Sequence, residues 1–292
     1  MQTSTGPGRS RARILWPLLA GAAWITSMVW VAAQTGPGGV VAGLVPSCVL
    51  ALVVAGAFLW LGRWERARPG RLVSAFAWGA SWAAFCALCS QAALQALVDA
   101  TVSTGFGHWF RPLVITPVTE EGFKALFLVW LWVYRRRQIT GLLDWIVHAG
   151  LVGAGFAFTE NVLYLGKALT AFAAAGTSDA HAAGRLLITF FLRTVMIPFF
   201  HPLMVTLSGA GIAASTRMRG RAARTGLALA GVLLAMALHG VWDWAGLAGS
   251  DPYLIYKIYA AVLVPVFLTV LILVLALRRR DGRTIATSTQ AG

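Results

Sequence analysis

The sequence contains few charged residues. Only 12% of its 292 residues are Asp, Glu, Lys or Arg, and only 10 are acidic. Together with a hydrophobic fraction of 58%, this scarcity excludes an ordinary soluble domain. Three cysteines lie in apolar runs, and Cys86 and Cys89 are expected to be small core residues rather than a redox or zinc pair. The chain has no glycine-rich nucleotide loop and no HExxH metal motif.

Apolar runs of about 20 residues recur along the whole chain, and each is long enough to cross a bilayer. Backbone groups in lipid must be hydrogen-bonded within their own segment, and the alternating pattern of a transmembrane barrel is absent, so the runs are expected to be helices. The sequence therefore predicts an all-α, polytopic membrane helix bundle of about eight transmembrane helices. They are expected at about 14–33, 40–62, 72–98, 112–134, 142–165, 185–214, 226–246 and 253–277.

The net charge of +14 comes from basic residues that are clustered between the apolar runs. This distribution is typical of a topology signal, and it argues against binding of nucleic acid. All five clusters fall on one side of the predicted bundle, so both termini are expected in the cytoplasm. The chain is expected to be a multi-pass protein of the plasma membrane. The clusters cover residues 9–13, 63–71, 135–137, 217–224 and 278–283.

A single domain is expected. The sequence predicts a basic cytoplasmic tail at 1–13, one integral-membrane domain at 14–277 with a catalytic core at about 112–246, and a cytoplasmic tail at 278–292. Residues 31–33 resemble a signal-peptidase site, although the length of the first run favours a retained helix. The arginine-rich, lysine-poor composition suggests a bacterium of high GC content.

The stretch PVTEEGFK, residues 117–124, places two carboxylates and a lysine in an otherwise apolar span. Ionisable residues are costly inside a bilayer, so they are kept mainly where they have a function or a partner. Pro117 suits the first turn of a helix, and Thr119 is expected to cap a helix that starts there. Glu120 and Lys124 share a helix face at i,i+4, and this ion pair taken alone could be purely architectural.

Other ionisable residues lie in the later spans, and most of them share one depth. At about 1.5 Å per residue, the charges on four helices fall in one layer of the outer leaflet, which isolated structural groups would not be expected to do. His201 is the exception unless Pro198 breaks its helix, and Asp144 and His148 lie apart at the cytoplasmic end. The residues whose estimated depth defines the layer are Glu120, Glu160, Arg193, His239 and Asp243.

These residue types suit the activation of water. Two crowded carboxylates can provide a general base or acid, and histidines can donate hydrogen bonds to an oxyanion. The same Glu and His side chains could instead bind Zn²⁺, whose bound water ionises near neutral pH. Both routes lead to hydrolysis of an amide, and the residues alone leave the choice open. Small residues at Gly150, Gly153 and Gly155 are expected to permit close helix packing near this site.

Four motifs between 117 and 243 resemble those of the PrsW-type intramembrane proteases, which are related to type II CAAX prenyl endopeptidases and abortive-infection-like membrane proteases. PVTEEGFK resembles E-E-x-x-K, GFAFTEN resembles F-x-x-x-E-N, PFFHP supplies the isolated membrane histidine, and HGVWD resembles H-x-x-W-D. The resemblance implies an intramembrane endopeptidase that cuts a single-span membrane protein, such as an anti-sigma factor, near the outer face.

The resemblance also implies roles for individual residues. The catalytic residues would be Glu120, Glu121, Glu160, His201, His239 and Asp243. Lys124, Asn161 and Arg193 would support them. If a zinc ion is the cofactor, Glu160, His201 and His239 are candidate ligands, but the glutamate-type and metalloprotease mechanisms both remain open. Glu160 stands where the prenyl endopeptidases have a histidine, and Lys124 replaces their arginine.

Two other functions fit some of these features. Buried Glu, His and Asp also form proton relays in transporters and channels. Against this alternative, the polar residues form one layer rather than a path, and no inverted repeat is visible. A non-catalytic membrane scaffold is the second alternative, and it would be favoured if motif residues were missing.

Overall fold

The computed structural model describes residues 7–63, 67–176, 178–247, 251 and 253–290. Within these ranges the chain is helical and contains no β-strand, which confirms the predicted fold class. The predicted tails and the basic cluster at 63–71 lie partly outside the described residues. The α-helices are α1 (Pro7–Leu61), α2 (Pro69–Trp78), α3 (Ala84–Thr101), α4 (Thr104–Phe110), α5 (Thr116–Trp130), α6 (Leu142–Ala175), α7 (Ala180–Phe191), α8 (Phe200–Ser215), α9 (Arg221–Leu247), α10 (Leu254–Ile258) and α11 (Val264–Gln290).

Six helical stretches in the described part of the chain are long and apolar enough to cross a membrane. One of them, Leu15–Leu61, joins two limbs at Gly36, which has φ 73°, so α1 accounts for the first two predicted spans. The stretch with Glu120, Glu121 and Lys124 is not among the six, because it carries all three charges. The count of eight spans therefore stays a prediction.

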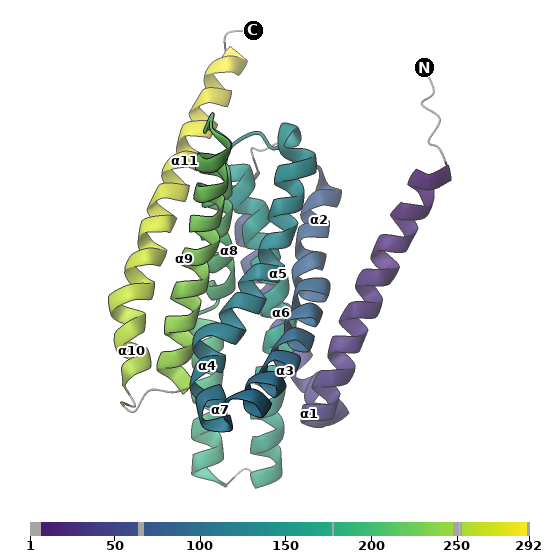
Figure 1. The fold of residues 1–292 in the computed structure, drawn as a ribbon, viewed down its shortest axis with the longest axis vertical. Helices are drawn as coiled ribbons and strands as arrows, with labels where there is room; N and C mark the ends of the chain where they lie inside the picture. The colour runs from purple at the N-terminus through teal and green to yellow at the C-terminus, as the bar shows by residue number, and fades with distance from the viewer. Residues whose placement is uncertain (1–6, 64–66, 177, 248–250, 252, 291–292) are drawn as a thin grey trace.

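The helices form one elongated bundle (Figure 1). The upper end of the bundle in Figure 1 contains the first residues of α1 and α6 and the last residues of α11. The helix ends next to the five basic clusters all lie there as well. This arrangement agrees with the expected topology, and the cytoplasmic placement of that end remains a prediction.

α6 is the central helix, and it packs against α1, α2 and α8. Its glycines allow these contacts, as the sequence predicted. A Cβ added at Gly153 would lie 2.5 Å from the Pro202 backbone of α8. One at Gly155 would overlap the carbonyl of Phe76 on α2, and one at Gly150 would overlap the ring of Phe58 on α1. Close packing at Gly153 brings the start of α8 directly against α6.

The chain between α7 and α8 is broken, as Pro198 predicted. A π-helical turn, Leu192–Met196, continues α7 and ends at Ile197, whose backbone N–H donates to the carbonyl of Leu192. The next helix begins at Phe200, which places His201 in the first turn of α8. Because proline cannot donate a backbone hydrogen bond, the break occurs where the ladder would otherwise be interrupted.

The expected helix start at Pro117 is wrong. Helical backbone runs without a gap from Thr104 through α4, a π-helical turn at Arg111–Ile115, and α5. The cap is Ser103, whose Oγ accepts a hydrogen bond from the Phe106 backbone N–H at 3.1 Å. Thr119 lies inside the helix and donates to the carbonyl of Ile115 instead. Glu120 and its neighbours are therefore in the middle of a helix and not at its positive end.

The cysteines are free, and Cys48 and Cys89 are exposed on the surface of the bundle. Cys89 is therefore not a core residue, contrary to expectation. Cys86 is only partly exposed.

Candidate active site

α5 presents three charged side chains together in the interior of the bundle. Glu120 is 5% exposed, Glu121 1% and Lys124 0%. Lys124 Nζ lies 3.1 Å from Glu120 Oε2 and 2.7 Å from Glu121 Oε1. A fully buried ammonium requires such partners, because the cost of removing it from water is otherwise not offset. The i,i+4 and i,i+3 spacings on one helix face supply them.

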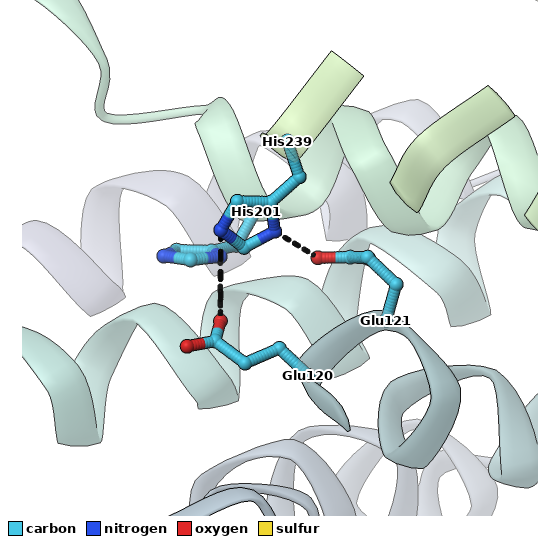
Figure 2. A group of neighbouring side chains, drawn as sticks. All are labelled: Glu120, Glu121, His201 and His239. Carbon is cyan, nitrogen blue, oxygen red and sulfur yellow. Dashed lines mark hydrogen bonds and ion pairs between the residues drawn. The ribbon is translucent and has the colours of Figure 1, made fainter. Parts of the chain in front are cut away.

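Two histidines from other helices complete this group. His201 of α8 places Nδ1 2.9 Å from Lys124 Nζ, and His239 of α9 places Nδ1 2.8 Å from Glu121 Oε1. Each histidine also has a nitrogen 3.9 Å from Glu120 Oε2. Figure 2 shows both imidazoles facing the two carboxylates of α5. Side chains of α5, α8 and α9 thus converge on one buried centre.

Glu160 of α6 extends the group on the side of His201. Its Oε2 lies 2.6 Å from His201 Nε2 and 2.6 Å from the Arg193 guanidinium. The guanidinium also stacks over Tyr164, 3.6 Å from the ring centroid. Arg193 therefore neutralises Glu160, and Glu160 fixes the orientation of the His201 ring.

Asp243 extends the group on the side of His239 and contacts that imidazole. Its Oδ2 lies 3.3 Å from His239 Nε2, at the i,i+4 spacing that the sequence predicted. Aromatic rings pack against the centre, since Phe200 lies edge-on to both imidazoles and Lys124 Nζ lies 3.8 Å from the Phe156 ring centroid.

A cavity of about 610 Å³ opens next to this centre. Its lining includes Glu120, Glu160 and Asp243, and it extends to Arg111 and Lys167, which are exposed. Glu121 does not line it. Three of the four acidic side chains in the group are therefore accessible from one space, while the fourth lies behind them.

Some predicted residues stay apart from the group. Asn161 is 4% exposed and lies next to Glu160 in the chain, but its Oδ1 has no hydrogen-bond partner. Asp144 and His148 pair with each other at 3.0 Å near the start of α6. A second cavity, of about 440 Å³, lies at that end and is lined by arginines such as Arg136, without any acidic residue.

Gln91 of α3 belongs to the site, although its sequence context did not predict it. Its Nε2 donates a hydrogen bond to Glu120 Oε1 at 3.2 Å, and the side chain lines the large cavity. The signal was an amide in an apolar span, with further polar residues four and eight positions later. A neutral amide costs less to bury in a membrane span than a charge, so it is a weaker indicator of function.

The residues present fit a divalent metal ion. Glu120, Glu121, His201 and His239 each offer one ligand atom, and these atoms lie within 4.8 Å of one another. Imidazole and carboxylate are ligands that Zn²⁺ accepts. Glu121 Oε2 is buried without a hydrogen-bond partner, as an atom that awaits a cation would be.

The charges of the group lead to the same conclusion. Counting Glu160 and Asp243, it has four carboxylates beside the fixed cations Lys124 and Arg193, and such an excess of acidic side chains attracts a further cation. The ligand group differs from the candidate set of the sequence, because it contains the two glutamates of α5 in place of Glu160. Lys124 Nζ now contacts three of the four candidate ligands and would have to move aside for an ion.

A family model described as PrsW family intramembrane metalloprotease matches residues 68–274. The matched range contains every residue of the buried group, and it leaves out α1. No curated protein and no solved structure matches the chain.

Proposed function

Because the chain belongs to the PrsW family of intramembrane metalloproteases, we propose that it hydrolyses a peptide bond of a membrane-anchored protein at this buried group. The observation that carries the proposal is the convergence of acidic and imidazole side chains from α5, α6, α8 and α9 beside a cavity. We further propose that the substrate is a single-span protein, such as an anti-sigma factor, and that the protein is located in a bacterial plasma membrane.

Glu120 is the proposed general base, because it lines the cavity while Glu121 lies behind it. A water oxygen attacks the carbonyl carbon of the substrate as Glu120 accepts the water proton. The same proton is then donated to the amide nitrogen as the C–N bond breaks. In this metal-free form of the mechanism, a ring N–H of His201 or His239 that turns from its carboxylate partner would stabilise the negative charge that develops on the carbonyl oxygen.

In the metal-dependent alternative, Glu120, Glu121, His201 and His239 would hold a zinc ion, and zinc supplies a polarised water when it is bound. The other groups act through these side chains. Glu160 and Asp243 would orient the two imidazoles, as carboxylates commonly do for metal-binding histidines.

Proton-coupled transport is not favoured. A relay would need polar groups across the membrane, but Asp144 and His148 are the next ionisable residues along α6, and His148 precedes Glu160 by about 18 Å of helix. The part of the chain between them on α6 is apolar or glycine-rich.

Proteoliposomes that contain the purified protein and a fluorogenic library of transmembrane peptides test the proposed function. We expect cleavage by the wild type and none by Glu120→Ala, which controls for a contaminating protease. Cleavage that persists in Glu120→Ala would refute the catalytic assignment. Proton flux that depends on Glu160, without any cleavage, would support a transporter instead.

A second test concerns the metal. We expect about one zinc ion per purified chain by elemental analysis, and a loss of both zinc and activity after treatment with a chelator. His239→Ala should lower the zinc content, whereas Asp144→Asn, which changes a residue outside the group, should not. Full activity in a sample shown to be free of metal would favour the glutamate-type mechanism.

A further inference from the structure

One face of α3 carries polar side chains along the C-terminal half of the helix. Gln91, Gln95 and Asp99 are spaced four residues apart, so they lie above one another on the helix. All three line the cavity that contains Glu120. Leu94 and Leu97, on the same stretch of helix, are 39% and 57% exposed on the surface of the bundle. The polar face therefore lines the cavity, and it extends along α3 from Gln91, next to Glu120, to Asp99.

Gln91 is the end of this face that touches the active-site group. The residue is 7% exposed, and its Nε2 donates to Glu120 Oε1. Its own Oε1 has no hydrogen-bond partner among the described residues. One half of the amide is therefore occupied by Glu120, and the other half can accept a hydrogen bond in the cavity.

Gln95 continues the face one turn further out. Its Nε2 donates to Asp99 Oδ1 at 2.8 Å, while its Oε1 is buried and has no partner. Gly107 of α4 packs directly against this amide, and a Cβ there would lie 2.5 Å from Gln95 Nε2. A buried acceptor without a donor is uncommon in native structures, so this atom needs an explanation.

A transmembrane peptide creates a demand for such groups when it is cleaved. The scissile bond of a helix is shielded, so the helix must unwind locally, and its freed backbone N–H and C=O groups lose their partners in a medium that supplies none. The side-chain amides of Gln91 and Gln95 lie on consecutive turns of α3, and Gln91 is next to the general base. They can therefore form hydrogen bonds with the freed backbone groups of the substrate.

We propose that Gln91 and Gln95 form the subsite that binds the unwound backbone of the substrate beside Glu120. The subsite rests on the proposed function and names a structural class of substrate for it, a peptide that is extended where it meets α3. When the substrate binds, the Gln95 side chain turns so that its Oε1, which is buried in the free protein, accepts a hydrogen bond from a backbone N–H of the substrate. Gln91 Oε1 accepts a second one, while its Nε2 holds Glu120 in place.

An ester scan of the substrate tests this subsite. In a cleavable transmembrane peptide, each backbone amide near the scissile bond is replaced in turn by an ester, which removes one N–H. We expect two ester positions, one for each amide oxygen, to lower kcat/KM of the wild type about tenfold each, the usual effect of losing one hydrogen bond. In Gln95→Leu one of these two esters should have less than about a twofold effect, because its acceptor is already absent.

The all-amide peptide is then compared among variants. Gln95→Leu should raise KM with little change in kcat, since Gln95 does not contact Glu120. Leu94→Ala, on the exposed side of α3, should leave both constants unchanged. Thermal unfolding in detergent shows whether each variant is folded.

Three results would overturn the subsite. The first is a wild type that tolerates an ester at every position, which decides the question even if Gln95→Leu does not fold. The second is that both esters have the same effect in Gln95→Leu as in the wild type. The third is a wild type that cleaves none of the amide peptides, which refutes the proposed function and removes the subsite with it.

Discussion

Replacement of Glu120 by glutamine should lower kcat about 1000-fold while the protein remains folded. General acid–base catalysis commonly contributes a factor of about 10² to 10⁴, and an amide cannot accept the water proton. The fold should tolerate the change because Gln91 and the new amide can both rotate to keep a hydrogen bond between them. The measurement is steady-state cleavage of a transmembrane peptide in proteoliposomes, with kcat and KM determined separately.

Glu121→Gln provides an informative comparison. Glu121 Oε1 is the closest partner of Lys124 Nζ and also contacts His239 Nδ1. Loss of its charge should reduce activity and also lower the unfolding temperature, whereas Glu120→Gln should reduce activity with little change in stability. Equal destabilisation by both variants would contradict the view that Glu120 is the carboxylate available for chemistry.

Asp251→Asn is the matched control for both variants. Asp251 lies in the loop before α10, where a hydrogen bond from Lys257 holds the pKa of its carboxyl below the ordinary value. It is therefore charged at neutral pH, and the substitution removes a real negative charge from a residue that does not line the cavity. We expect unchanged kcat, so a loss of activity in this control would indicate a general effect of charge.

The fold class and the membership of the buried group could be predicted from the sequence, because both depend on local patterns. Apolar runs reveal helices, and ionisable residues in such runs are few enough to stand out. The i,i+4 spacing of His239 and Asp243 predicted their contact correctly. The glycines of α6 likewise predicted the close approach of α8.

The remaining features depend on tertiary packing, which a local pattern does not contain. The sequence suggested a helix start at Pro117, but proline at that position is also compatible with a helix that changes to a wider turn just before it. The depth of His201 could not be calculated from a constant rise per residue, because the helix is interrupted at Pro198. A role for Gln91 in the site could not be predicted, because a neutral amide in an apolar helix has many structural explanations.

Lys124 links these observations. It is the largest fully buried side chain, and its three partners come from α5 and α8. Without a metal it is the cation that allows Glu120 and Glu121 to stay together in a medium of low dielectric constant. With a metal it would give up this position, so Lys124 determines how stable the protein is before an ion binds.

Lys124→Met should therefore destabilise the metal-free protein by about 3 to 5 kcal/mol, the range found when one partner of a buried ion pair is removed. Methionine has a similar length but leaves Glu120 and Glu121 without their cation. The measurement is the loss of folded protein on titration with a denaturant in detergent, after removal of metal. Added zinc should restore part of the lost stability, because a divalent ion would compensate the same two carboxylates.

The double variant Lys124→Met/Glu121→Gln separates charge from packing. Removing one of the two carboxylates should recover a large part of the stability lost in Lys124→Met, since fewer unpaired charges remain buried. Activity should not return, because Glu121 is part of the catalytic group. If the double variant is as unstable as the sum of the two single variants, the ammonium stabilises the fold by packing alone, and the electrostatic role proposed for Lys124 is wrong.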